Sequence, residues 1–353
     1  MCGIAGFVND MPIDVKCPVL QRMTDMIAHR GPDSEGHYID EHAALGHRRL
    51  SIIDLGGGQQ PIYNEDGSKV ITFNGEIYNY QTLREELIAA GHTFTTKSDT
   101  EVLLHGYEQW GVDLLQRVRG MFTFVIWDKN KQELFGARDH FGIKPFYYAK
   151  MNGTFMYASE IKSLLRHPDF VKELNAEALK PYMTFQYPAI GETFFKGVYK
   201  LPEGHYFTYR DGKMDIHRYY DEDFREGKQK LGELVNSIDQ TVCDSVKAHQ
   251  IADVEVGSFL SSGVDSSYVA AVARPQHTYS IGFGKGTYNE SQQAGELAEL
   301  LKLNNTAESL TDEEAFAAFP RIQWHLDEPD SNPSCVPLYF PVSYTHLTLP
   351  TIA

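Results

Sequence analysis

The pattern of apolar and polar positions changes near residue 220. Before that point, short apolar runs are separated by turn dipeptides. Three pairs of runs are typical of hairpins: residues 121–127 with 133–137, 145–150 with 154–158, and 206–209 with 214–219. Asn152-Gly153 and Asp211-Gly212 are dipeptides that two-residue hairpin turns prefer. The pattern therefore predicts an antiparallel, β-rich N-terminal domain with a few helices.

Beyond residue 220 the pattern alternates between helix and strand. Residues 221–230 (DEDFREGKQK) are charged and contain little apolar content, which is typical of a linker. Helical periodicity follows at residues 231–247, 266–273, 290–301 and 312–326, and strand-like runs at 254–260 and 278–283. This alternation predicts a parallel sheet covered by helices.

Composition narrows the class of protein. A chain of 353 residues is long enough for two domains. Its 48 acidic and 32 basic side chains give a net charge of -16, which argues against nucleic acid and anionic membranes as partners. The four cysteines include no Cys-x-x-Cys pair, and the start lacks the pattern of a signal peptide. No apolar stretch reaches the ~18 residues that span a bilayer. We expect a soluble, cytoplasmic protein.

The residue after the initiator suggests catalysis. A small second residue such as Cys2 usually allows Met1 to be removed, which leaves a cysteine with a free α-amine. An amine with a pKa of about 7.7–8.0 can accept the proton of a thiol whose pKa is about 8.5. Cys2 would then carry nucleophile and general base together. The alternative is a small apolar residue at the start of a buried strand.

Three further motifs offer groups that could serve such a nucleophile. An Asn74 side-chain amide and a Gly75 backbone N–H could form an oxyanion hole, although Asn-Gly is also the commonest tight-turn dipeptide. Arg48 and Arg49 are adjacent on a strand, so only one guanidinium can enter a pocket and bind a carboxylate; the alternative is a surface pair. Asp99 begins a helix, either as an N-cap or as a partner for an ammonium group.

A second candidate site begins at residue 261. The sequence SSGVDSS (261–267) follows an apolar run and precedes a helix, an arrangement in which backbone N–H groups can bind phosphate. It lacks the Gly-Lys-[Ser/Thr] of the common nucleotide-binding loop. Asp265 would face a magnesium ion that bridges phosphates. The alternative is an ordinary capped helix. The histidines, including His29, His47 and His105, show no metal-ligand spacing, and we assign them no ligand role.

Together, these motifs resemble those of the glutamine-hydrolysing asparagine synthetases over about residues 1–342. The resemblance rests on seven segments: Cys2-Gly3-Ile4, 29–33 (HRGPD), 49–52 (RLSI), 74–79 (NGEIYN), 98–101 (SDTE), 138–145 (RDHFGIKP) and 261–267. It implies an α+β N-terminal-nucleophile amidohydrolase sandwich (αββα) over residues 1–220 and a linker at 221–230. A partial α/β ATP-pyrophosphatase domain (adenine nucleotide α-hydrolase-like) would follow over 231–342.

The resemblance also implies roles for single residues. Cys2 would be the nucleophile, and Asn74 and Gly75 the oxyanion hole. Glutamine would be bound by Arg49, Ile53, Asn74, Gly75, Glu76 and Asp99. ATP would be bound by Leu260, Ser261, Gly263, Asp265, Ser266 and Ile281. Asp265 would also hold Mg²⁺, so that the cofactor is MgATP and no other is expected.

The implied reaction has two stages. Glutamine is hydrolysed to ammonia, and ATP activates aspartate as β-aspartyl-AMP, which ammonia converts to asparagine. Glutamine, aspartate and ATP would be the small-molecule partners, and a homodimer is an assembly that the resemblance allows. The central Ser262 departs from the family's Ser-Gly-Gly and is tolerable only if its φ is negative.

The tail is the larger departure. Residues 343–353 match nothing in the family, so we expect the synthetase domain to be incomplete and glutaminase activity to be the one that survives. Two alternatives stay open. One is another type 2 glutamine amidotransferase or amide ligase, and the other is a non-catalytic partner of a full-length synthetase. Glutamate release that depends on Cys2 separates an enzyme from such a partner.

Overall fold

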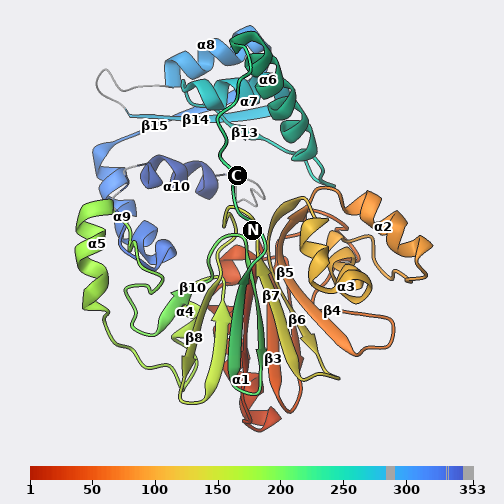
Figure 1. Cartoon of the computed structure of the whole chain (residues 1–353). Coiled ribbons are helices and arrows are strands. Elements are labelled where there is room, and N and C mark those ends of the chain that lie inside the picture. Colours follow the sequence, from red (N-terminus) through yellow and green to blue (C-terminus); the bar gives the residue numbers. More distant parts are fainter. Residues whose placement is uncertain (284–290, 331, 333, 345–353) are drawn as a thin grey trace. The chain divides into compact units, whose positions relative to one another are not determined.

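The computed structural model describes residues 1–283, 291–330, 332 and 334–344. The chain divides into two compact units, Met1–Glu222 and Asp223–Ala353 (Figure 1). Residues 345–353, most of the expected 343–353 tail, lie outside the described residues. Each of the two units is compact by itself.

Two six-stranded antiparallel sheets form the first unit. Sheet one has the order β10-β8-β9-β1-β3-β2, and sheet two has the order β12-β11-β7-β6-β5-β4. The strands of sheet one are β1 (Gly3–Val8), β2 (Ser34–Ile39), β3 (Ala43–Arg49), β8 (Tyr147–Met151), β9 (Thr154–Ala158) and β10 (Val198–Lys200). Those of sheet two are β4 (Ile62–Tyr63), β5 (Lys69–Ile77), β6 (Gly120–Asp128), β7 (Glu133–Arg138), β11 (His205–Arg210) and β12 (Lys213–Arg218).

Helices cover the outer face of each sheet. They are α1 (Ile13–Asp25), α2 (Tyr80–Ala89), α3 (Asp99–Trp110) and α4 (Ile161–Leu164), while α5 (Leu179–Phe185) has no buried residue. Leu20 and Met23 of α1 pack with Phe7 against sheet one. Leu103 of α3 packs with Phe73 of β5 against sheet two, and Figure 1 shows α2 and α3 beside β5. The expected αββα order is confirmed.

The core between the sheets fixes which way each strand faces. Ile4 and Leu45 of sheet one meet Val70, Trp127 and Phe207 of sheet two in one buried cluster. Burying an aliphatic or aromatic side chain of this size contributes about 1.5–3 kcal/mol. Because side chains alternate along a strand, every second residue from these five also faces the space between the sheets.

Strand β5 corrects one interpretation of the sequence. It continues through Asn74 and Gly75, which pair with Thr123 and Phe122 of β6, so the tight turn is wrong there. The neighbouring strand supplies partners on both sides of the dipeptide, and this pairing overrides the local turn preference. At Asn152-Gly153, by contrast, φ values of 50° and 84° form the expected hairpin turn.

The second unit contains a parallel sheet, β13-β14-β15, with helices between its strands. Its elements are α6 (Leu231–Ala248), β13 (Ser258–Phe259), α7 (Val264–Ala273), β14 (His277–Phe283), α8 (Ser291–Leu301), β15 (Asn304–Leu310), α9 (Asp312–Leu326) and α10 (Cys335–Tyr344). The strand expected at 254–260 is only two residues long, and residue 290 of the expected 290–301 helix lies outside the described residues. The alternation of helix and strand is confirmed.

Residues 221–230 and helix α6 are two exposed features of the chain. Residues 221–230 are exposed and form neither helix nor strand. Helix α6 exposes apolar side chains at helical spacing, with Leu231 78%, Val235 55% and Ile238 60% exposed. Within the described ranges, no helix combines the length and the apolar character that crossing a membrane requires.

Candidate active site

Strand alternation places Cys2 and Arg49 on the inner face of sheet one. Ile4 and Leu45 fill the core between the sheets, and Cys2 and Arg49 lie two and four residues from them. The Cys2 Sγ lies 3.3 Å from the backbone nitrogen of Leu50, which donates to it, and 3.5 Å from the Leu50 carbonyl oxygen. The thiol therefore sits directly beside the end of β3.

The same alternation turns Asn74 and Glu76 of β5 toward sheet one. Both lie an even number of residues from Val70, whose side chain belongs to the core between the sheets. A contact across the sheets sets the level at which they meet, because Nε2 of His47 on β3 lies 3.0 Å from the carbonyl oxygen of Phe73. The carboxyl-terminal half of β5 therefore faces the end of sheet one that carries Cys2 and Arg49.

Three buried polar groups of β5 have no hydrogen-bond partner within the part of the chain that the structure describes, and two of them lie in its carboxyl-terminal half. These two are Nδ2 of Asn74, in a side chain 1% exposed, and Oε1 of Glu76, in a side chain 3% exposed. Leaving a buried donor or acceptor unpaired costs about 1–3 kcal/mol. Side chains that carry this cost point to a ligand that completes their hydrogen bonds.

The Gly75 amide faces the free edge of β5. The N–H of Phe73 donates to Oε1 of Gln60 at 2.7 Å, and the N–H of Ile77 donates to Oδ2 of Asp99 at 3.0 Å, both away from β6. Backbone N–H groups two residues apart point to the same edge of a strand. Gly75 lies midway between them, so its N–H points to that edge too.

Arg49 is a buried cation held by carbonyl oxygens. Its guanidinium donates to the carbonyl oxygens of Asp54 at 2.7 Å, Ile53 at 3.1 Å and Leu55 at 3.4 Å. It is 5% exposed and forms no ion pair with any described residue. Arg48 lies on the other face of β3 and forms its ion pairs there. A buried guanidinium without a carboxylate is ready to bind an anion.

Glu76 and Asp99 form an acidic pair that makes no ion pair with any described residue, although the charge of Lys144 acts on Glu76. Burial raises the pKa of Asp99 to about 6. Burial also raises the pKa of Glu76, against the opposing charge of Lys144 and with a further increase from Asp99. Each carboxylate therefore lies within range of the other's charge. A ligand with an ammonium group would lower both pKa values and would stabilise the charged pair.

The loop after β7 supplies a site residue, Lys144, to which no sequence motif assigned a role. Lys144 is 3% exposed, and its Nζ lies 3.0 Å from the Met1 sulfur. Arg138 fixes the loop by donating to the carbonyl oxygens of Lys144 at 2.8 Å and Gly142 at 2.6 Å. The Asp139 carboxylate accepts the Lys144 N–H at 2.9 Å. The sequence signal that could have pointed to Lys144 was the segment 138–145, whose polar residues build this loop.

The start of the chain is anchored from behind. Arg30 Nε donates to the Cys2 carbonyl oxygen at 3.0 Å, and its Nη1 pairs with Glu160 at 2.9 Å. Burial raises the pKa of the Cys2 thiol, while the nearby amino terminus and Arg49 lower it. Burial, Arg30 and Lys144 lower the pKa of the Met1 amine to about 5. The Met1 amine is therefore mostly neutral at pH 7.

In the second unit, the 261–267 loop folds back on itself at the start of α7. The Ser261 and Ser266 hydroxyl oxygens lie 2.8 Å apart, and Gly263 N–H donates to Ser261 Oγ at 3.2 Å. Gly263 is the N-cap, with φ at -69°. Ser262 is not among the residues with positive φ, so its Cβ causes no backbone strain.

The other expected ATP-binding residues surround this loop. Leu260 is buried, and its N–H donates to the carbonyl oxygen of Tyr279 at 2.8 Å. Ile281 lies on β14. Asp265 is exposed in the first turn of α7. One exposed carboxylate beside a helix N-terminus fits Mg²⁺, which usually takes few protein ligands and completes its shell with phosphate and water.

The family model described as glutamine amidotransferase domain matches residues 1–220. The chain belongs to this family. A second model, described as asparagine synthase, matches residues 237–347. Together with the relatives below, these matches confirm the resemblance to glutamine-hydrolysing asparagine synthetases.

Curated relatives extend the similarity to nearly the whole chain. Asparagine synthetase [glutamine-hydrolyzing] 1 of Bacillus subtilis is 43% identical over 348 residues, which cover 96% of this chain and 55% of that protein. A putative asparagine synthetase of Methanocaldococcus jannaschii is 32% identical over 96% of this chain and 70% of its own length. The chain spans about half the length of the first relatives that it matches.

Among solved structures, glutamine phosphoribosylpyrophosphate amidotransferase of Bacillus subtilis is 16% identical, with a TM-score of 0.47. The match covers 87% of this chain and 65% of that one.

Proposed function

We propose that the first unit hydrolyses glutamine to glutamate and ammonia, with Cys2 as the nucleophile. The observation that carries this proposal is a set of buried groups that lack partners and together complement an amino-acid amide. Arg49, Glu76 and Asp99 form no ion pair with any described residue, and the Asn74 amide nitrogen has no acceptor among those residues. A free α-amino acid whose side chain ends in an amide would satisfy all four.

The substrate ends would bind in separate places. Arg49 would hold the α-carboxylate, with its guanidinium oriented by the Ile53 carbonyl oxygen. Glu76 and Asp99 would accept hydrogen bonds from the α-ammonium group. The side-chain amide carbon would then lie next to the Cys2 sulfur, between the two sheets.

The reaction would start from a mature chain that begins with Cys2. Its α-amine accepts the thiol proton, and the sulfur attacks the amide carbon. Asn74 Nδ2 and the Gly75 N–H donate to the oxyanion of the tetrahedral intermediate, each worth about 10²–10³ in rate. The intermediate expels ammonia, which carries away the proton held by the amine. Water then hydrolyses the glutamyl thioester, which releases glutamate and restores the thiol.

For the second unit we propose MgATP binding, in support of asparagine synthesis through β-aspartyl-AMP. Ser261, Gly263 and Ser266 would contact phosphate with Leu260 beside them, Asp265 would face Mg²⁺, and Ile281 would contact adenine through its backbone. The asparagine synthase match and the names of the relatives support this assignment. Aspartate would be the acceptor, the cytoplasm the place of the reaction, and a homodimer the assembly.

The glutaminase proposal is tested by glutamate release from the full chain. A Cys2→Ala variant should fall to the background rate, while Cys17→Ala, which removes an exposed thiol on α1, should keep the wild-type rate. Mass spectrometry should show that Met1 is absent from the active protein. Equal rates for wild type and Cys2→Ala would contradict the proposal. A non-catalytic partner would likewise show no glutamate release that depends on Cys2.

A further inference from the structure

Four metal-ligating side chains gather in the first unit, away from Cys2. Glu65 lies in the turn between β4 and β5, His92 follows α2, and His105 and Glu108 lie one turn apart on α3. Their ligand atoms all lie within 4.8 Å of one another. The four residues come from three separate segments of the chain, so the fold brings them together.

Two separations around His105 are close to those between the ligand atoms of a tetrahedral ion. His105 Nδ1 lies 3.1 Å from Glu108 Oε2 and 3.4 Å from Glu65 Oε2. His92 Nδ1 lies 3.2 Å from Glu65 Oε1. A tetrahedral ion with bonds of about 2.0–2.1 Å to nitrogen and oxygen separates its ligand atoms by about 3.3 Å.

The His92 imidazole is hydrogen-bonded on its far side, and the His105 imidazole faces a carboxylate there without a hydrogen bond. Both rings turn Nδ1 toward the glutamates, and Nε2 of His105 lies 3.5 Å from Oε1 of Glu101. Nε2 of His92 lies 3.3 Å from Oε1 of Gln109. Metal-binding histidines almost always donate their second ring N–H to a carboxylate or carbonyl oxygen, which fixes the ring and its tautomer. The His92 ring therefore already has the arrangement of a metal ligand.

The glutamates are oriented in the same way. Oε1 of Glu65 accepts the N–H of Thr93 at 3.0 Å, and Oε1 of Glu108 accepts Nδ2 of Asn64 at 2.7 Å. In both carboxylates, Oε2 is the oxygen that faces His105.

We propose that Glu65, His92, His105 and Glu108 bind one divalent transition-metal ion, with zinc preferred. Two imidazoles and two carboxylates form a ligand set that suits Zn²⁺. Without a metal, one proton on His105 Nδ1 faces two carboxylates at once, whereas an ion accepts all four ligands.

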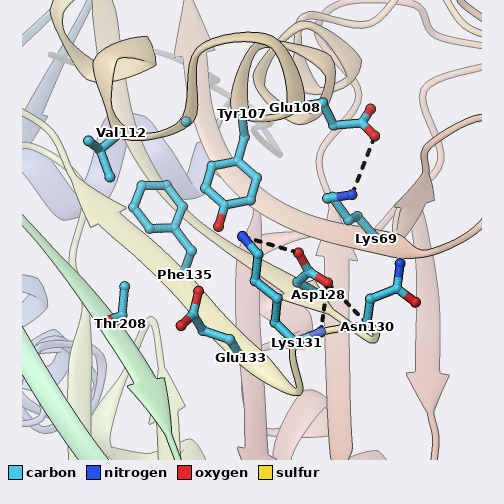
Figure 2. Close-up of a pocket in the computed structure, with 11 residues that line it drawn as sticks. Lys69, Tyr107, Glu108, Val112, Asp128, Asn130, Lys131, Glu133, Phe135 and Thr208 are labelled. Carbon is cyan, nitrogen blue, oxygen red and sulfur yellow. Dashed lines mark hydrogen bonds and ion pairs between the residues drawn. The ribbon is translucent and has the colours of Figure 1, made fainter.

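The ion would hold together the three chain segments that carry its ligands, and it would take no part in amide cleavage. Glu108 pairs with Lys69 at 3.5 Å, at the edge of a pocket of about 640 Å³ that also contains Tyr107 and Lys131 (Figure 2). Lys69 begins β5 and Glu76 lies seven residues further on, about 23 Å along the strand. The metal site and the glutamine site therefore lie at opposite ends of β5.

The test uses the full chain, stripped with a chelator and then titrated with Zn²⁺ or Co²⁺. We expect one ion per chain by elemental mass spectrometry, and a Co²⁺ spectrum that is tetrahedral without thiolate bands. His92→Gln and Glu65→Gln should weaken binding by at least about 100-fold. Gln109→Ala, which frees the His92 ring, should weaken it about 10- to 100-fold. His217→Gln, an exposed histidine on β12, should bind like wild type.

Three results would overturn the proposal. They are no stoichiometric ion in the wild type, thiolate bands that vanish in Cys2→Ala, and equal affinities for wild type, His92→Gln and Gln109→Ala. Thermal unfolding in metal-free buffer checks that the variants fold. If His92→Gln does not fold, the affinity of Gln109→Ala decides, because the Gln109 side chain is exposed.

Discussion

Asn74 illustrates how much the candidate site depends on single buried groups. Its amide nitrogen has no partner among the described residues, and Glu76 nearby has an unpartnered oxygen. The sequence pointed to Asn74 and Gly75 through a dipeptide that a turn explained equally well. Lys144 was missed as a site residue because the fold of its loop positions it. A local sequence pattern does not show which residues a loop brings together.

Removing the Asn74 donor should slow chemistry more than binding. We expect Asn74→Ala to lower kcat of glutamine hydrolysis by about 10²–10³ with little change in KM, because the donor acts on charge that develops in the transition state. Steady-state kinetics measure both constants. The matched control is Asn130→Ala, an exposed asparagine in the turn after β6. A large rise in KM at unchanged kcat would assign Asn74 to substrate binding instead.

Glutamine binding should depend on pH through Asp99. Its pKa of about 6 means that the carboxylate is mostly neutral at pH 5 and mostly charged at pH 7. Only the charged form attracts the α-ammonium group, so affinity should rise about tenfold between these pH values. Calorimetry on Cys2→Ala protein measures binding without turnover. Asp99→Asn should bind more weakly and lose this tenfold share, which leaves the rise due to Glu76, whose pKa burial raises to about 8; an equally steep dependence in that variant would exclude Asp99 as a source.

At the scale of elements, β5 is the part that sequence patterns described least well. The hairpins at 152–153 and 211–212 were predicted because their turns are set by local backbone preference. The end of β5 was not, because pairing with β6 decides it. Strand β15 was also missed, since its sequence NNTAESL contains few apolar residues and most of it is exposed. Strands that are defined by their neighbours leave little trace in the sequence.

A side chain at Gly75 should destabilise the first unit. A Cβ there would lie 2.2 Å from the Met121 carbonyl oxygen and 2.7 Å from the Phe122 Cα, both backbone atoms that cannot move alone. We expect Gly75→Ala to lower the free energy of unfolding by about 1–3 kcal/mol in urea denaturation. Gly191→Ala, where nothing lies within 4 Å, is the control and should change little. Similar stabilities for both variants would show that β6 adjusts freely.

At the scale of the whole chain, the two units differ in how completely they cover their apolar surface. The first has three buried clusters formed by two sheets and their helices. The described part of the second has one small cluster, and α6 exposes Leu231, Val235 and Ile238. The change of pattern near residue 220 anticipated two differently built parts. No spacing rule could anticipate the Glu65–Glu108 cluster, because its three segments meet only after folding.

The 221–230 segment should be the first point of cleavage. It is exposed, lacks helix and strand, and contains Arg225, Lys228 and Lys230. Brief trypsin treatment should release a fragment of about residues 1–225 that keeps glutaminase activity, because that fragment contains all the groups proposed for glutamine hydrolysis. Mass spectrometry and glutamate release follow the two outcomes. Earlier cleavage inside 1–220, or loss of activity on cleavage at the segment, would contradict this.

The alternation of β5 limits how this protein can vary. The side chains of Asn74 and Glu76 and the backbone N–H of Gly75 must all reach the glutamine site. A single inserted codon upstream of Asn74 would rotate the ribbon by half a period and direct the donor amide toward α3. A two-codon insertion keeps the facing and only slides the register. Natural variants and laboratory libraries should therefore tolerate insertions or deletions of two residues in β5 upstream of Asn74, or none at all.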